Sequence, residues 1–148
     1  MATNSWVIRG TGLALLLAGG HSVCQPAGHS LPLPAETRVI EILADKDSRY
    51  KISGENKPEI TVRAGEQVVL RITARKAKTW NRDGSIHGFT LLRAKDRTKV
   101  PDWNLLLRPG TQEFLLTAPA EPGEYVVVCT VICSENHEGM NMKFLVVL

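Results

Sequence analysis

The sequence predicts an all-β domain, folded as an antiparallel sandwich or a small barrel. Three observations indicate this class. Short runs rich in β-branched and other apolar residues recur along the chain, Pro-Gly pairs at 109–110 and 122–123 precede two of these runs, and no segment carries a long helical periodicity. Apolar runs of strand length that are bounded by turn residues are typical of sandwiches and barrels.

Six segments have the composition and length of strands. They are residues 58–62, 67–73, 87–92, 111–117, 124–129 and 143–148. The first two flank a turn that contains Gly65, and we expect them to form a hairpin. The polar, basic segment 73–85 is predicted to be a loop. Phe114, Tyr125 and Phe144 are predicted to lie in the core.

Composition excludes several classes of protein. The 148 residues, 43% of them hydrophobic, suffice for one domain and a short extra segment. The net charge of +3 is small, and acidic residues are interspersed among the basic ones at 71–99, so we expect a solvated face and no nucleic-acid partner. Three cysteines are too few for a disulfide-built miniprotein. No apolar run reaches the roughly 18 residues that cross a bilayer, so no transmembrane span is expected.

The N-terminal segment has the layout of an export signal. Arg9 precedes the apolar stretch 13–18, and small residues lead up to Cys24. This order indicates a secretory signal peptide or a lipoprotein anchor segment over residues 1–24, with Cys24 as the lipid attachment point in the second case. Residues 25–37 contain three prolines and are predicted to be a linker to a domain at 38–148. We therefore expect a periplasmic protein, or one at the outer face of the cytoplasmic membrane.

A compact set of metal-binding side chains lies between the last two predicted strands. Cys129, Cys133, His137 and Met140 follow the spacing C-x3-C-x3-H-x2-M, so one loop can supply four donors. Soft sulfur ligands with an imidazole suit copper and, less well, zinc, and a thioether favours copper further. A loop held by two strands of a rigid sandwich is a suitable place for such a site.

A further ligand is expected from another part of the fold. His87 begins a predicted strand and is followed by Gly88, and a residue without a side chain lets a second loop approach closely. His21 and His29 belong to the N-terminal segment and are poor candidates.

The residues alone leave several interpretations open. Cys129 and Cys133 could form a disulfide in an oxidising compartment. With His87 and His137 they could instead form a structural zinc site, with Met140 in the core. A mononuclear blue-copper site could use His87, Cys133, His137 and Met140 and leave Cys129 as a buried thiol. Met142 could replace Met140 as the thioether, although strand alternation makes Met142 a packing residue.

Residues 50–148, about two-thirds of the chain, resemble a cupredoxin, a Greek-key β-sandwich. The loop 129–140 resembles that of the CuA domain of cytochrome c oxidase subunit II and of nitrous-oxide reductase, and so does the preceding segment 118–129. The ligand pattern of these CuA domains is matched by His87, Cys129, Cys133, His137 and Met140.

The resemblance implies a binuclear copper centre. Cys129 and Cys133 would bridge two copper ions, and His87 and His137 would each bind one. The resemblance further implies that Met140 binds one copper weakly and that the backbone carbonyl of Val131 binds the other. Most members of that family carry Glu at the position of Val131, and a carbonyl donor does not depend on that side chain.

The implied function is one-electron transfer. Shared thiolates and a rigid scaffold keep the geometry similar in both redox states, and no open coordination position is implied, so we expect an electron carrier and not an enzyme. The expected partners are cytochrome c or a similar donor and a terminal oxidase or reductase, which the protein would serve as a stand-alone carrier or a detached subunit. A copper chaperone or store is the alternative.

Two tryptophans and two acidic residues could serve a redox partner. In the oxidase family an exposed aromatic residue near the site receives the electron, and Trp80 and Trp103 are the candidates here, although packing or loop anchoring is the favoured interpretation of both. Glu135 and Glu138 flank His137 and could steer a basic cytochrome.

Overall fold

The computed structural model describes residues 37–76 and 81–148. Nine strands and one short 3-10 helix lie within these residues. They are β1 (Arg38–Asp45), β2 (Arg49–Lys51), β3 (Glu59–Arg63), β4 (Gln67–Ala74), β5 (His87–Arg93), β6 (Lys99–Leu107), β7 (Gly110–Thr117), β8 (Gly123–Val128), η1 (His137–Gly139) and β9 (Asn141–Val147). In this part of the chain no helix is long and apolar enough to cross a membrane.

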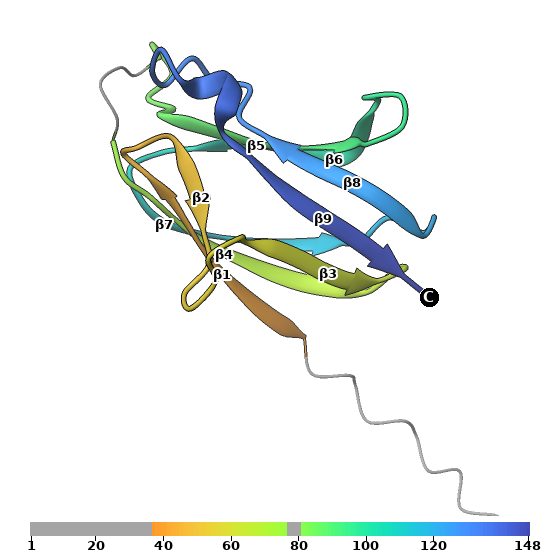
Figure 1. Ribbon diagram of the computed structural model, residues 1–148. Helices are drawn as coiled ribbons and strands as arrows, with labels where there is room; N and C mark the ends of the chain where they lie inside the picture. Colours follow the sequence, from red (N-terminus) through yellow and green to blue (C-terminus); the bar gives the residue numbers. More distant parts are fainter. Residues whose placement is uncertain (1–36, 77–80) are drawn as a thin grey trace, which may run out of the picture. The chain divides into compact units, whose positions relative to one another are not determined.

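The strands form two sheets that pack face to face as a sandwich (Figure 1). One sheet has the order β2-β1-β4-β7 and the other the order β3-β9-β8-β5-β6. Some neighbours, such as β5 and β6, are consecutive in sequence, whereas others, such as β4 and β7, are not. The chain crosses between the sheets several times, as in a Greek-key arrangement. This confirms the predicted all-β sandwich.

The predicted hairpin of 58–62 and 67–73 is wrong. β3 pairs in parallel with β9, where Ile60 lies opposite Phe144, whereas β4 pairs with β1 and β7 in the other sheet. Both strands bury alternate residues, so each has one apolar face to cover. The turn between β3 and β4 carries the chain from one sheet to the other. The buried faces of the two strands therefore face each other across the core, and the strands do not pair side by side. The sheets are therefore mixed, because β1–β4 and β3–β9 are parallel pairs.

Three strands were not predicted, namely β1, β2 and β6. In β6, Trp103, Leu105 and Leu107 are buried in alternation, but Pro101 and a left-handed Asp102 (φ 64°) interrupt the pattern. Such breaks are tolerated here because β6 is an edge strand. The loop predicted at 73–85 begins later than expected, since β4 runs to Ala74.

The core lies between the two sheets. Phe144 and Tyr125 are buried as predicted, and Phe114, on the edge strand β7, is half-buried against the core. Met142 is also buried, which agrees with a packing role. Trp103 meets Phe144 edge to face with ring centroids 5.1 Å apart. Burying side chains of this size contributes about 1.5–3 kcal/mol each.

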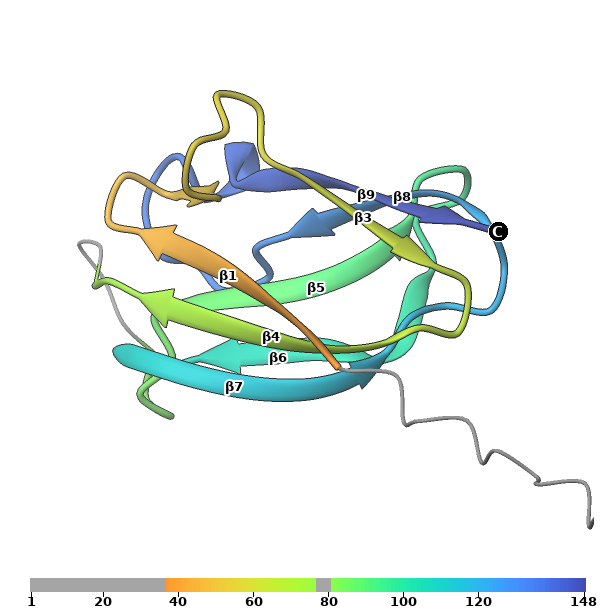
Figure 2. The same cartoon turned by 90° about the horizontal axis from the view of Figure 1, so that it is seen from below.

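Several chain segments meet at one end of the sandwich. β5 begins there at His87, β8 ends there at Val128, and the loop 129–140 returns the chain to β9. The end of β4 and the turn between β1 and β2 lie at the same end (Figures 1 and 2). The fold thus gathers residues from four separate stretches of sequence around the predicted ligand loop.

Candidate metal centre

Three of the predicted site residues converge in the structure. Ligand atoms of His87, Cys129 and Cys133 lie within 4.8 Å of one another, and all three residues are buried. His87 is the first residue of β5, and Cys129 directly follows β8. Both thiols are free, with their Sγ atoms 3.8 Å apart. The contact joins residues 42 and 46 positions apart in sequence, which the sandwich brings together.

The ring of His87 is oriented by the backbone of the chain just after β4. Its Nε2 lies 2.9 Å from the carbonyl oxygen of Arg75. Because a carbonyl only accepts, Nε2 carries the proton and Nδ1 presents a lone pair. That Nδ1 is buried and has no hydrogen-bond partner. Burial also holds the pKa of His87 below its ordinary value of 6.5, against the opposing effect of the Arg75 carbonyl. A neutral imidazole with a buried, unpaired lone pair is what a metal ion requires.

The Cys129 thiol sits between two backbone groups. The N–H of Gly88 donates to its Sγ at 3.2 Å, and the thiol donates to the carbonyl of Val131, also at 3.2 Å. Burial raises the pKa of this thiol from 9.0 to about 11, although the Gly88 N–H works in the opposite direction. The thiol is therefore protonated at neutral pH without metal, and metal binding has to release that proton.

Gly88 permits the close approach that the sequence predicted. A Cβ atom at this position would lie 2.7 Å from Oγ1 and 2.9 Å from the backbone N of Thr130. The backbone of the ligand loop therefore packs directly on the start of β5. Any side chain at position 88 would force the two apart and move Cys129 away from His87.

Two residues at the site were missed by the sequence analysis. The Tyr50 hydroxyl donates to the carbonyl of Gly88, and its ring packs edge to face on Phe89. Ser48, in the turn between β1 and β2, places its hydroxyl 3.7 Å from the Sγ of Cys133. Neither residue belongs to a ligand motif, and β2 is three residues long, so no pattern in the sequence could have found them.

The other predicted ligands are Val131, Met140 and His137, and the structure shows the contacts that each of them makes. The carbonyl of Val131 lies beside the Cys129 sulfur. Met140 is fully buried, and its carbonyl accepts from the N–H of Cys129 at 3.1 Å, so its backbone lies alongside that cysteine. His137 lies in η1, half-buried, and its Nδ1 donates to the carbonyl of Ser134 at 3.0 Å. The structure does not bring His137 into the cluster of His87 and the two cysteines.

The donors that are present fit a soft metal ion. Two thiolates that hold a tetrahedral ion at about 2.3 Å each lie about 3.8 Å apart, which is the separation found here. Each ion of a shared pair would face the same two sulfurs, so this distance suits one ion or two. A disulfide needs sulfurs about 2.05 Å apart, and the structure holds the thiols in a different arrangement.

The residues that the sequence offers for contact with a redox partner differ in exposure. Trp103 is only 1% exposed, and its indole N–H donates to the carbonyl of Thr117 at 2.9 Å. It joins β6 to β7 and is not an exposed entry residue, so the packing interpretation holds. Trp80 lies outside the described residues. Glu135 and Glu138 are both exposed, on either side of His137.

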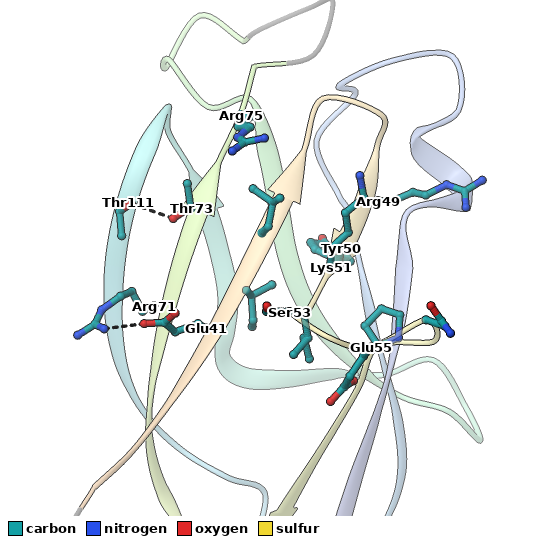
Figure 3. Close-up of a pocket in the computed structure, with 15 residues that line it drawn as sticks. Glu41, Arg49, Tyr50, Lys51, Ser53, Glu55, Arg71, Thr73, Arg75 and Thr111 are labelled. Atoms are coloured by element: carbon teal, nitrogen blue, oxygen red, sulfur yellow. Dashed lines mark hydrogen bonds and ion pairs between the residues drawn. The ribbon is translucent and has the colours of Figure 1, made fainter.

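A hollow lies on the outer face of the sheet that contains β1 and β4 (Figure 3). Its volume is about 760 Å³. Two of the cations that line it are paired, Arg71 with Glu41 at 2.8 Å and Lys51 with Asp45 at 2.7 Å. Neither His87 nor either thiol lines it, so this hollow is separate from the metal-binding cluster.

Comparison with known proteins places the fold. No protein-family model matches the sequence, and no curated protein matches it. Solved structures do match. A chain of a heme-copper terminal oxidase dimer shares 21% identity over 76% of this chain, with a TM-score of 0.53, and the match spans 66% of that chain, just under two thirds.

Two copper proteins are similar to about the same degree. Auracyanin A, a "blue" copper protein from the green thermophilic photosynthetic bacterium Chloroflexus aurantiacus, matches 74% of this chain and 98% of its own at 23% identity, with a TM-score of 0.53. Rusticyanin from Thiobacillus ferrooxidans matches 77% of this chain and 79% of its own at 18% identity, with a TM-score of 0.51. At these identities the likeness establishes the fold alone, which is that of a cupredoxin.

Proposed function

We propose that this protein carries single electrons through a binuclear copper centre at the loop end of the sandwich. The ligands in this proposal are His87, Cys129, Val131, Cys133, His137 and Met140, with Val131 contributing its backbone carbonyl. The observation that carries the proposal is the convergence of the His87 imidazole with two free, buried thiols. Two thiolates and an imidazole in a rigid β scaffold are a ligand set that copper favours.

The position of Cys129 favours the binuclear centre over a mononuclear one. In a mononuclear site that uses Cys133, the Cys129 thiol has no role in binding. Here, however, its sulfur lies 3.8 Å from that of Cys133 and receives a hydrogen bond from the Gly88 N–H. A hydrogen bond of this kind stabilises a metal-bound thiolate. The Cys129 sulfur is thus placed to act as a ligand beside that of Cys133.

The chain's own residues keep the site rigid and dry. Arg75 fixes the ring of His87 through its carbonyl, and Tyr50 holds the carbonyl of Gly88, the residue whose N–H donates to Cys129. The copper pair, when bound, supplies one-electron redox chemistry with the charge shared between two ions. His137 would hold copper through Nε2, because its Nδ1 donates to the carbonyl of Ser134.

We also propose where the protein works. The layout of residues 1–24 supports export to the periplasm or to the outer face of the cytoplasmic membrane. There the protein would accept electrons from cytochrome c or a similar donor and pass them to a terminal oxidase or reductase, as a stand-alone carrier or a detached subunit. The fold that it shares with a chain of a heme-copper terminal oxidase supports this class of partner.

The test is redox cycling of the copper-loaded protein. We expect one electron per chain to be taken up from reduced cytochrome c and returned to an added oxidant over repeated cycles, with reversible loss and recovery of colour. Cys129→Ser should abolish this behaviour, because a shared pair of ions needs both sulfurs.

Other outcomes identify the alternatives. A colourless protein that retains copper but exchanges no electrons would be a store or chaperone. A Cys129→Ser variant that still cycles and is intensely blue would indicate a mononuclear site. Binding of zinc and not copper would contradict electron transfer altogether.

A further inference from the structure

The turn between β1 and β2 reaches the second sulfur of the site. Ser48 is 3% exposed, and its hydroxyl lies 3.7 Å from the Sγ of Cys133 and 2.6 Å from the hydroxyl of Ser134. Ser48 is 85 positions from Cys133 in sequence, so only the fold brings them together. A buried hydroxyl next to a sulfur ligand is a group that can adjust that sulfur's electron density.

The backbone of Ser48 is held in an unfavourable conformation. Its φ angle is 57°, in the left-handed region that residues with a side chain rarely adopt. Its N–H donates to the carbonyl of Asp45 at 3.1 Å, which closes the turn. Glycine would fit this position without strain, yet the position carries a serine whose hydroxyl points into the site. Strain retained at such a place indicates that the side chain has a role.

The hydrogen bonds around Ser48 can all run in one direction. The N–H of Asn136 donates to the Ser134 hydroxyl oxygen at 3.1 Å. A metal-bound thiolate has no proton and only accepts. Ser48 must then donate to Cys133, and Ser134 donates to Ser48. The chain of donors starts in the ligand loop, passes through the turn between β1 and β2, and ends on the sulfur, and successive bonds of this kind strengthen one another.

We propose that Ser48 is a positioning residue that donates a hydrogen bond to the Cys133 thiolate and raises the reduction potential of the centre. This inference rests on the proposed function, since it requires a metal-bound Cys133. The Gly88 N–H has the same relation to Cys129, so each sulfur receives one donor from outside the ligand loop. A donor withdraws electron density from sulfur and so favours the electron-rich, reduced form of the centre.

The test uses two variants that remove the hydroxyl in different ways. Ser48→Ala keeps the strained backbone, whereas Ser48→Gly also relieves it and therefore preserves folding. In both variants we expect the reduction potential of the copper-loaded protein to fall. The redox equilibrium constant should change by up to about tenfold, which corresponds to about 59 mV for one electron. A charge-transfer band that shifts in both variants should accompany this fall.

Arg97→Ala is the matched control. Arg97 has a similar left-handed φ of 63° but lies in the turn between β5 and β6, away from the ligand loop. It should leave the potential unchanged. An unchanged potential in both Ser48 variants would overturn the proposal, and so would a fall in Ser48→Gly that Ser48→Ala does not share, because only the glycine variant changes the backbone strain. If the unaltered protein binds no copper, the proposed function fails first.

Discussion

Individual residues at the end of the sandwich that carries the loop 129–140 have distinct structural roles. His87 presents its Nδ1 because the Arg75 carbonyl holds its other nitrogen. Gly88 allows the ligand loop to come close and donates to the Cys129 sulfur. The sequence predicted His87 and Gly88 because a ligand beside a glycine is a local pattern. It could not predict Ser48 or Tyr50, whose roles depend on which strands become neighbours.

Gly88→Ala is expected to weaken both folding and copper binding. The added methyl would lie 2.9 Å from the backbone N of Thr130, which cannot move aside as a flexible side chain could. Overpacking of this kind costs about 1–3 kcal/mol of unfolding free energy. Chemical denaturation of the metal-free protein measures the loss.

Gly139→Ala provides the control for this substitution. Gly139 is in η1, near the same loop, and nothing lies within 4 Å of an added Cβ. Its stability should match that of the unaltered protein. Equal stabilities for Gly88→Ala and Gly139→Ala would show that the close approach at Gly88 is not tight.

The metal-free protein should lose stability at alkaline pH. Because burial raises the pKa of Cys129 from 9.0 to about 11, the folded protein retains a thiol proton that the unfolded chain releases. The contribution is complete below pH 9.0 and is lost as pH rises towards about 11. Denaturation at a series of pH values should show a smaller alkaline loss in Cys129→Ser. The same loss in both proteins would contradict the raised pKa.

At the scale of strands, apolar alternation predicted six elements but not their partners. Alternation reveals which face of a strand is buried, but it does not reveal which neighbour completes the sheet. For this reason the sequence predicts a hairpin of β3 and β4, although these strands lie in different sheets. β6 was missed because Pro101 and Asp102 interrupt its pattern at an edge where such breaks are tolerated.

Trp103 joins β6 to β7 and should act through stability alone. Trp103→Phe removes the indole N–H that donates to the Thr117 carbonyl. The substitution leaves this carbonyl without its donor and creates a small cavity in the core. We expect a loss of about 1–3 kcal/mol in unfolding free energy. The rate of electron uptake from cytochrome c should not change, because the residue is buried. A much slower uptake with unchanged stability would restore Trp103 as an entry residue.

At the scale of the whole molecule, the sandwich acts as a frame for one loop. The sequence predicts this loop as a ligand loop because its four candidate donors lie within twelve residues of one another. The orientation of His137 was beyond prediction, since its ring bonds the Ser134 carbonyl through a choice of rotamer that the motif does not specify. All the proposed ligands lie on β5 or on the loop between β8 and β9, and Ser48 and the Arg75 carbonyl connect them to the other sheet.

Copper loading should therefore stabilise the entire fold. Binding to the folded state alone adds about 2.7 kcal/mol when free copper is at 100 times its dissociation constant. Calorimetry should show a higher unfolding temperature for the loaded protein, and the increase should largely disappear in His87→Ala. An increase that survives in His87→Ala would place the copper at another site.

The most direct test of the central claim is the copper content of the loaded protein together with its electron spin resonance spectrum. The account predicts two copper ions per chain and a hyperfine pattern in which one unpaired electron is shared equally by two copper nuclei. One copper per chain with the pattern of a single nucleus, or a protein that takes up no copper at all, would contradict it.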